Sequence, residues 1–284
     1  MSRRSRILIV DGYPKASRDE LEAAGMKTAW KLYDGMIRRH LRGAQTRVWL
    51  PSDTADLPDG EGPGTYDGIL WTGCNLTIYH HHDDRVTRQI EFARRAYAAG
   101  TPQFGTCWGI QMATVAAGGE VAANPKGREM GLARRIRLTP EGARHPFLRG
   151  RTPVFTGFIS HLDMVTRLPR GATWLATNDF SRVQAAAIRH GRGVFWATQY
   201  HPEYDLHDMA RLIVAREGKL VKEGFYRNHR ELAAHVGLME ALARNPDRKD
   251  LRWQLDIGDD ILVTESRQLE VANWVSECVL RRRR

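Results

Sequence analysis

The chain has 284 residues, of which 42% are hydrophobic and 27% are charged. This composition supports a substantial packed core and excludes an intrinsically disordered chain or a collagen-like fibre. The formal net charge is +10, from 43 Lys and Arg against 33 Asp and Glu, but the cationic residues are mostly Arg and are scattered along the chain, which is typical of compositional bias rather than of a nucleic-acid-binding face.

The N-terminal part of the chain alternates between predicted strands and predicted helices. Continuous apolar runs predict buried strands over residues 7–10, 46–50 and 67–72. Apolar residues at three- and four-residue spacing predict helices over 28–41 and 83–99, with Asp83 as N-cap and Gly100 ending the second helix. Residues 51–66, rich in Pro, Gly and Asp, predict a loop. This alternation predicts an α/β fold, a doubly wound, mostly parallel open sheet with helices on both faces.

A nucleophile motif follows the next predicted strand. Gly105, Cys107 and Gly109 have the spacing of a nucleophile elbow, a sharp strand-to-helix turn that lifts the central side chain above the sheet. The exposed amides at the start of the helix favour a thiolate at Cys107, and the amide of Trp108 is suited to hold an oxyanion. The alternative is a structural role for Cys107 as a small buried hydrophobe.

A second motif lies at the end of another predicted strand. Residues 194–199 form an apolar run that leads directly into His201, Pro202 and Glu203. A Cys nucleophile needs a base that is itself oriented by a third group, and His201 with Glu203 supplies that pair. Ligands of open α/β sheets lie beyond the carboxyl ends of the strands, so we expect both motifs to meet there.

The end of the chain is predicted to be helical. Amphipathic patterns predict helices over 205–214, 229–243 and 265–280, with an apolar connector at 253–262. We therefore divide the chain into a catalytic domain, 1–204, and a helical C-terminal extension, 205–284, packed on the core. The alternative is that the extension forms a docking surface for a synthetase or for a second copy of the chain.

The remaining Cys and His residues indicate no metal site. Cys74, Cys107 and Cys278 are too few and too widely spaced for a disulfide framework or a zinc knuckle, which favours a reducing compartment. The consecutive residues His80 to His82 point in different directions, whereas zinc ligands come from separated positions. The apolar run at 7–10 is too short for a signal peptide or a membrane span, so we expect a cytoplasmic protein.

Taken in order from about residue 7 to residue 204, these motifs resemble the class I glutamine amidotransferases, the triad-type glutaminase family, and most of all its stand-alone GMP-synthase-like members. The family pattern comprises a first strand, a glycine turn, G-x-C-x-G-x-Q, S-H-x-D and Q-x-H-P-E. The resemblance implies that Cys107 is the nucleophile, that His201 is the general base and acid, and that Glu203 orients His201.

The resemblance also implies an oxyanion hole. Gly73 falls where the family has a Gly-Gly turn whose backbone amide completes the oxyanion hole together with the amide at Trp108. The chain departs from this pattern, because Cys74 replaces the second glycine. The backbone amide of Cys74 is still available, so the resemblance implies that it takes part in the oxyanion hole, although its side chain reduces the backbone freedom of the turn.

Substrate-binding residues are implied at two further places. Gln111 matches the family residue that helps to bind glutamine, and Ser160, His161 and Leu162 belong to the segment 160–163 that grips the amino-acid end of the substrate. For His161 the alternative is a surface-loop histidine with a structural hydrogen bond.

The activity implied is hydrolysis of the glutamine side-chain amide through a γ-glutamyl thioester on Cys107, without metal or organic cofactor. The sequence contains neither a G-x-x-x-x-G-K-[ST] loop nor a Ser-Gly-Gly-x-Asp-Ser run, so we expect the ammonia to pass to a separate synthetase chain. One alternative is hydrolysis of another γ-glutamyl amide. A non-enzymatic alternative is a basic regulatory or nucleic-acid-binding module, against which the intact Cys, His and Glu set argues. We expect no nucleic-acid or membrane partner, and a homo-oligomer remains open.

Overall fold

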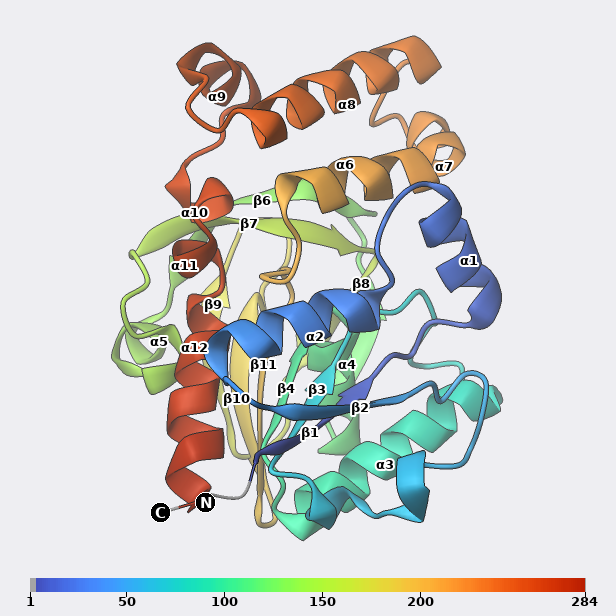
Figure 1. Ribbon diagram of the computed structural model, residues 1–284, viewed down its shortest axis with the longest axis vertical. Helices are drawn as coiled ribbons and strands as arrows, with labels where there is room; N and C mark the ends of the chain where they lie inside the picture. Colours follow the sequence, from blue (N-terminus) through green and yellow to red (C-terminus); the bar gives the residue numbers. More distant parts are fainter. Residues whose placement is uncertain (1–3, 284) are drawn as a thin grey trace.

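The computed structural model describes residues 4–283, and within them a large mixed sheet runs through the molecule (Figure 1). The strands, in chain order, are β1 (Arg6–Val10), β2 (Gln45–Trp49), β3 (Gly68–Trp71), β4 (Gln103–Thr106), β5 (Glu120–Ala123), β6 (Glu129–Leu138), β7 (Val154–His161), β8 (Asp163–Arg167), β9 (Ala172–Thr177), β10 (Ala185–His190) and β11 (Gly193–Thr198). The large sheet has the order β2-β1-β3-β4-β11-β10-β9-β6-β7, and β5 pairs with β8 separately. The first five strands in this order, β2, β1, β3, β4 and β11, run parallel to one another. The pairs that follow, from β11-β10 to β6-β7, are antiparallel.

Helices cover both faces of the sheet. They are α1 (Lys15–Ala23), α2 (Ala29–His40), α3 (Asp84–Ala99), α4 (Trp108–Ala116), α5 (Pro140–Arg144), α6 (Leu206–Ala215), α7 (Glu217–Lys222), α8 (His229–Arg244), α9 (Lys249–Leu255), α10 (Asp259–Leu262), α11 (Thr264–Arg267) and α12 (Leu269–Trp274). In β1, Ile7 and Ile9 pack with α2 and α12, whereas Leu8 and Val10 pack with α3 and α4. Because both faces of β1 are covered, the strand is a continuous apolar run.

The predicted α/β fold class and the predicted helix ends are confirmed. Asp83 is the N-cap of α3, where its carboxylate accepts a hydrogen bond from the amide of Arg85, and Gly100 ends α3 in the left-handed conformation at φ 73°. The antiparallel half of the sheet has no counterpart in the prediction. Its strand β6 alternates irregularly between buried and exposed residues, including Arg134 and Arg135, and therefore lacks the long apolar run of the central strands.

The C-terminal helices differ in detail from the prediction. The helix expected over 265–280 is divided into α11, α12 and a π-helical turn, Val275–Leu280, and the expected connector at 253–262 contains the end of α9 and all of α10. Trp253 is 86% exposed and adds nothing to the core. Trp274 is fully buried against β3, where a Cβ built on Gly68 would lie 2.7 Å from its ring. Part of the C-terminal region therefore belongs to the main core.

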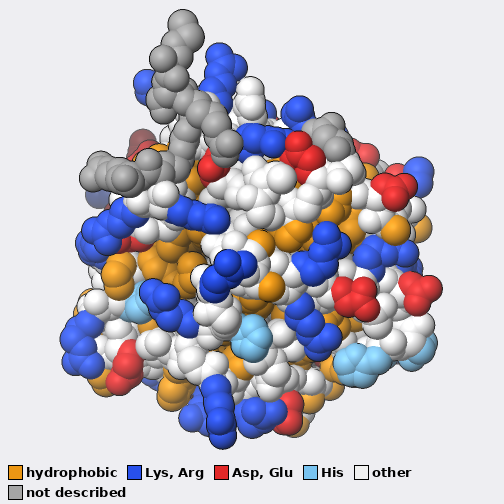
Figure 2. All heavy atoms as spheres, turned by 90° about the horizontal axis from the view of Figure 1, so that it is seen from below, with side chains coloured by type: hydrophobic (Ala, Val, Ile, Leu, Met, Phe, Trp, Pro, Cys, Tyr) orange, Lys and Arg blue, Asp and Glu red, His pale blue; other side chains and the backbone are white. Residues whose placement is uncertain are grey.

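The C-terminal region follows two paths across the molecule. Helices α6 to α9 lie at one end, next to β6 and β7, and the chain from α10 to α12 then descends along the sheet beside α2 (Figure 1). Figure 2 shows Lys and Arg side chains spread over the face that it presents, with Asp, Glu and His side chains and uncharged surface among them. Among the described residues, the helices are too short or too polar to span a membrane.

Candidate active site

The turn at Cys107 has the geometry of a nucleophile elbow. Strand β4 ends at Thr106 and α4 begins at Trp108, which leaves Cys107 between them at φ 53° and ψ −95°, in a backbone region that residues with side chains rarely adopt. A Cβ on Gly105 would lie 2.8 Å from the Cα of Gly109 and equally close to the Cβ of Trp71. Glycine at position 105 is therefore required for α4 to start directly above the sheet.

His201 reaches Cys107 because β11 runs parallel to β4 and pairs with it. Thr198, the last residue of β11, is the register partner of Thr106, and its carbonyl accepts a hydrogen bond from the amide of Cys107 at 2.8 Å. Three residues later, Nδ1 of His201 lies 2.6 Å from Oε1 of Glu203. Nε2 of His201 is buried without a hydrogen-bond partner among the described residues. One ring nitrogen is thus held by a carboxylate, and the other is available for chemistry.

The electrostatics of this pair favour a charged imidazole. Burial by itself lowers the pKa of His201, but the charge of Glu203, its hydrogen bond with the imidazole and the proximity of Cys107 outweigh burial and raise the pKa to about 9. The ring of Tyr204 stacks on the imidazole, with centroids 4.3 Å apart and planes 8° from parallel. The stacking fixes the plane of the ring, and the carboxylate fixes its rotation within that plane.

Two hydroxyl groups in series, those of Tyr33 and Thr106, support Glu203 through hydrogen bonds. Thr106 donates a hydrogen bond from Oγ1 to Oε1 of Glu203 at 3.0 Å, and the hydroxyl of Tyr33 lies 2.7 Å from the same Oγ1. Since Thr106 uses its proton on Glu203, Tyr33 is the donor to Thr106. Tyr33 is fully buried in α2. Sequence patterns predicted α2 but did not indicate that its tyrosine takes part in the site.

The turn after β3 lies against both motifs. A Cβ on Gly73 would stand 3.0 Å from Cε1 of His201 and 3.9 Å from Cβ of Cys107, so the absence of a side chain makes room for the imidazole. Neither Gly73 nor Cys74 has a positive φ. Replacement of the second family glycine by Cys74 therefore introduces no backbone strain. The amide of Trp108, at the start of α4, has no acceptor within its own helix.

A cavity of about 170 Å³ opens onto Cys107. Its lining includes Cys74, Gln111 and the segment Ser160, His161 and Leu162. Oε1 of Gln111 is buried without a partner among the described residues, and Sγ of Cys107 lies 3.5 Å from the main-chain oxygen of Ser160. The residues predicted to bind substrate are thus brought together around the predicted nucleophile.

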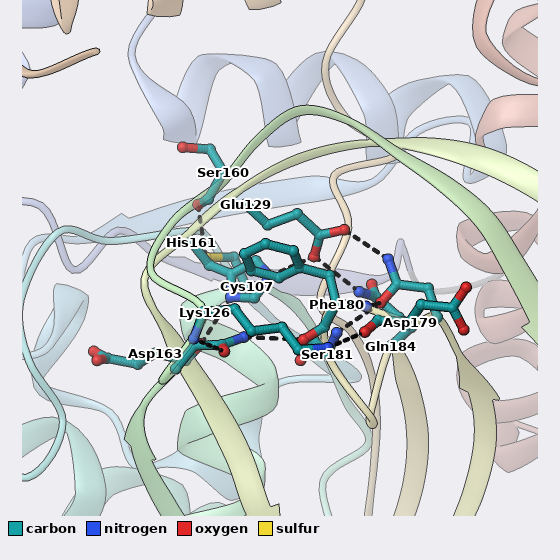
Figure 3. A network of polar contacts seen from close by, with 12 residues as sticks. Cys107, Lys126, Glu129, Ser160, His161, Asp163, Asp179, Phe180, Ser181 and Gln184 are labelled. Carbon is teal, nitrogen blue, oxygen red and sulfur yellow. Dashed lines mark hydrogen bonds and ion pairs between the residues drawn. The ribbon is translucent and has the colours of Figure 1, made fainter. Parts of the chain in front are cut away.

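His161 is tied into a buried polar network (Figure 3). Its Nδ1 lies 2.8 Å from the main-chain oxygen of Asp163 and its Nε2 lies 2.9 Å from Oε2 of Glu129. Glu129 also accepts hydrogen bonds from Asn178 at 2.6 Å and Gln184 at 3.2 Å. His161 is only 3% exposed, so the surface-loop alternative is wrong about its location, although its hydrogen bonds are structural. With both nitrogens occupied, the ring holds the segment 160–163 in place.

Three cations that the motifs did not indicate also line the cavity. Arg128, Arg216 and Lys219 face it, Arg128 from the loop before β6 and the other two from the end of α6 and from α7. Arg216 donates a hydrogen bond from Nη1 to Oγ of Ser160. Sequence reasoning missed these residues because they belong to no motif and lie among many scattered cations.

Solved structures share the fold of this chain. A glutamine amidotransferase from Thermotoga maritima superposes with a TM-score of 0.65 at 18% identity, covering 95% of this chain and 99% of its own. One from Methylobacillus flagellatus gives a TM-score of 0.64 at 18% identity, with 98% and 95% covered. At these identities the likeness concerns the fold, and it confirms the predicted class.

Sequence relatives extend over different lengths. A γ-glutamyl-L-1-hydroxyisopropylamide hydrolase from Pseudomonas sp. is 38% identical over 97% of this chain and 93% of its own length. A GMP synthase from Symbiobacterium thermophilum is 30% identical over 60% of this chain, which matches 31% of that synthase. Residues 35–219 match the family model for glutamine amidotransferase class-I. The chain therefore belongs to the class I glutamine amidotransferase family, as its motifs predicted.

Proposed function

We propose that the chain hydrolyses γ-glutamyl amides through a covalent thioester on Cys107, with His201 and Glu203 completing a catalytic triad. The observation that carries this proposal is the buried contact of 2.6 Å between Nδ1 of His201 and Oε1 of Glu203, which leaves Nε2 unpartnered beside Cys107. An elbow at Cys107 and a cavity that opens onto it supply the nucleophile and the room for a substrate. Nucleophile, base and orienting carboxylate form the constellation that acyl transfer requires.

Acylation begins with the thiolate of Cys107. Its sulfur adds to the γ-carbonyl carbon, and the carbonyl oxygen becomes an oxyanion. When the tetrahedral intermediate collapses, the C–N bond breaks and the departing amine takes a proton from Nε2 of His201. A γ-glutamyl thioester and a neutral imidazole remain. The pKa of about 9 for His201 supplies the proton at neutral pH.

Deacylation uses the same residues in reverse. Nε2 of His201 takes a proton from a water molecule, the hydroxide adds to the thioester carbon, and the C–S bond breaks to release glutamate. Both tetrahedral intermediates carry an oxyanion, for which the amides of Cys74 and Trp108 are the proposed donors. Removal of one such donor typically costs about 2.7–4 kcal/mol of transition-state stabilisation.

We further propose that the substrate is the γ-glutamyl amide of a small amine. The support is the relative from Pseudomonas, named for hydrolysis of such an amide, which is similar over nearly the whole of both chains, including the C-terminal helices. The purified protein is assayed for hydrolysis of glutamine and of a series of γ-glutamyl alkylamides. We expect a higher kcat/KM for alkylamides; a preference for glutamine would contradict this assignment.

The second candidate is a glutaminase that supplies ammonia to a separate synthetase. The similarity to GMP synthases favours it, although this chain spans only about a third of their length. Glutamine labelled with ¹⁵N at its amide distinguishes the two functions. In an extract that contains the partner, label transferred to a second product supports ammonia supply, whereas label recovered only as free ammonia argues against it.

We retain the division of the chain into a catalytic domain, 1–204, and a helical extension, 205–284. The extension is proposed to do more than cover the core, because α6 and α7 provide one wall of the cavity at Cys107. Deleting the extension is therefore expected to impair substrate binding as well as stability.

A further inference from the structure

We propose that Arg216, assisted by Lys219, binds the α-carboxylate of the γ-glutamyl substrate, so that the extension selects substrates with a free α-carboxylate. The inference rests on the proposed function for the identity of the substrate, but it concerns a residue that lies outside the triad motifs. Arg216 follows α6, whose last residue is Ala215, and Lys219 lies in α7.

The side chain of Arg216 is anchored next to the nucleophile. Its Nη1 donates to Oγ of Ser160, and the main-chain oxygen of the same serine lies 3.5 Å from Sγ of Cys107. A guanidinium carries five N–H donors in a rigid fork that matches a carboxylate. One donor fixes the fork on Ser160, which leaves others for a ligand in the cavity that Arg216, Ser160 and Cys107 all line.

Acidic side chains near Arg216 are already engaged by other side chains. Glu223 forms an ion pair with Arg128 at 2.7 Å, and Oε1 of Glu217 lies 2.7 Å from Nδ1 of His229. Within residues 4–283, neither Arg216 nor Lys219 forms an ion pair. The part of α6 and α7 that lines the cavity thus presents the cations Arg216 and Lys219, whereas Glu223, whose charge attracts both, does not line the cavity.

Two carboxylates also line the cavity. Glu20, from α1, and Asp163 line it. The hydroxyl of Tyr79 donates to Asp163, which keeps that carboxylate in place. Carboxylates and a guanidinium around one cavity match the ammonium and carboxylate groups of an α-amino acid. The γ-carbonyl is then directed toward Cys107.

A purely structural role for Arg216 would give a different result. A cation at the end of a helix stabilises the helix dipole, and a bond to Ser160 stabilises the segment 160–163. Either role affects every substrate equally. Recognition of the α-carboxylate affects only substrates that possess this group.

The experiment compares Arg216→Met and Arg216→Lys with the control Arg192→Met. The guanidinium of Arg192 is also hydrogen-bonded to the protein, to the main-chain oxygen of Ala98. Arg192 lies in the turn before β11, at the other end of this strand from Thr198, and does not line the cavity. Three amides are used: glutamine, glutaramic acid, which lacks the α-amino group, and 4-aminobutanamide, which lacks the α-carboxylate. Turnover gives KM and kcat, and calorimetric titration of the same amides into a Cys107→Ala background gives binding without chemistry.

We expect Arg216→Met to raise KM and the dissociation constant for glutamine and glutaramic acid by about tenfold to one hundredfold, the range for a lost charge-assisted hydrogen bond. Binding of 4-aminobutanamide is expected to stay at its wild-type level, and Arg216→Lys to recover part of the loss. An equal loss for all three amides, or no loss for any, would overturn the inference.

The two proposals fail in different ways. If the protein binds glutamine through Arg216 in the titration but releases no glutamate, the proposed hydrolysis is wrong and the inference stands. If the protein releases glutamate but Arg216→Met does not selectively weaken binding of the amides that carry the α-carboxylate, the inference is wrong and the hydrolysis stands.

Discussion

Thr106 donates a hydrogen bond from its hydroxyl to Oε1 of Glu203 at 3.0 Å, and the same oxygen lies 2.6 Å from Nδ1 of His201. Because Glu203 is buried, each donor to its carboxylate contributes to holding it in the correct orientation. Thr106, which directly precedes the proposed nucleophile Cys107, therefore supports Glu203, the residue that orients His201.

This relationship predicts the effect of a change at Thr106. Thr106→Val keeps the shape of the side chain and removes the donor, so we expect kcat/KM for a γ-glutamyl amide to fall about tenfold. Thr106→Ser retains the hydroxyl and should retain most of the activity. Thermal unfolding of both variants separates a loss of orientation from a loss of stability. Equal activities for the two variants would show that the hydroxyl plays no part.

Replacement of Glu203 by glutamine should change the pH dependence. The charge of Glu203 is a principal reason why the pKa of His201 is raised to about 9. Protonated His201 is the proposed acid, so wild-type kcat/KM should fall as the pH rises through about 9. In Glu203→Gln the carboxylate charge is gone and burial lowers the pKa, which moves this alkaline limb to lower pH. We also expect a loss of kcat of at least about a hundredfold. An alkaline limb that does not move would contradict the assignment.

Gly73→Ala tests the space beside the imidazole. The added methyl group would lie 3.0 Å from Cε1 of His201 and must displace the ring or the turn. Misplacement of a catalytic group by about 1 Å costs roughly a hundredfold in rate, and we expect a fall in kcat of that order. The matched control is Gly237→Ala in α8, where a Cβ meets nothing within 4 Å. If Gly73→Ala were as active as the control, His201 would not need this space.

A pair of tryptophans tests which part of the C-terminal region belongs to the core. Trp274 is fully buried against β3, so Trp274→Ala should lower the free energy of unfolding by about 3–5 kcal/mol. Trp253 is 86% exposed, and Trp253→Ala should change stability by no more than about 0.5 kcal/mol. Denaturant titration measures both. Similar small effects would mean that α12 is not part of the main core.

The sequence was sufficient to predict the parallel half of the sheet and the two motifs at its carboxyl end. Strands buried on both faces, such as β1, are continuous apolar runs, and the caps Asp83 and Gly100 mark their helix by local chemistry alone. Short motifs also fix Cys107, His201 and Glu203 relative to their own strands. Register between β4 and β11 then brings them together.

Other parts of the site depend on long-range packing and leave little trace in the sequence. Tyr33 joins the site only because α2 packs over the end of β4, and Arg216 only because the end of α6 lies next to Ser160 of β7. The partner of His161 is Glu129, on a neighbouring strand whose pairing the pattern did not predict. Local periodicity contains no information about such contacts.

The central claim is that Cys107 carries the γ-glutamyl group. Wild-type protein is mixed with a γ-glutamyl amide, quenched in acid during turnover and analysed by intact and peptide mass spectrometry. We expect a γ-glutamyl adduct on the peptide that contains Cys107, no adduct and no glutamate release in Cys107→Ala, and normal turnover in the control Cys278→Ala. Glutamate release that persists in Cys107→Ala, or an adduct on another residue, would contradict this claim.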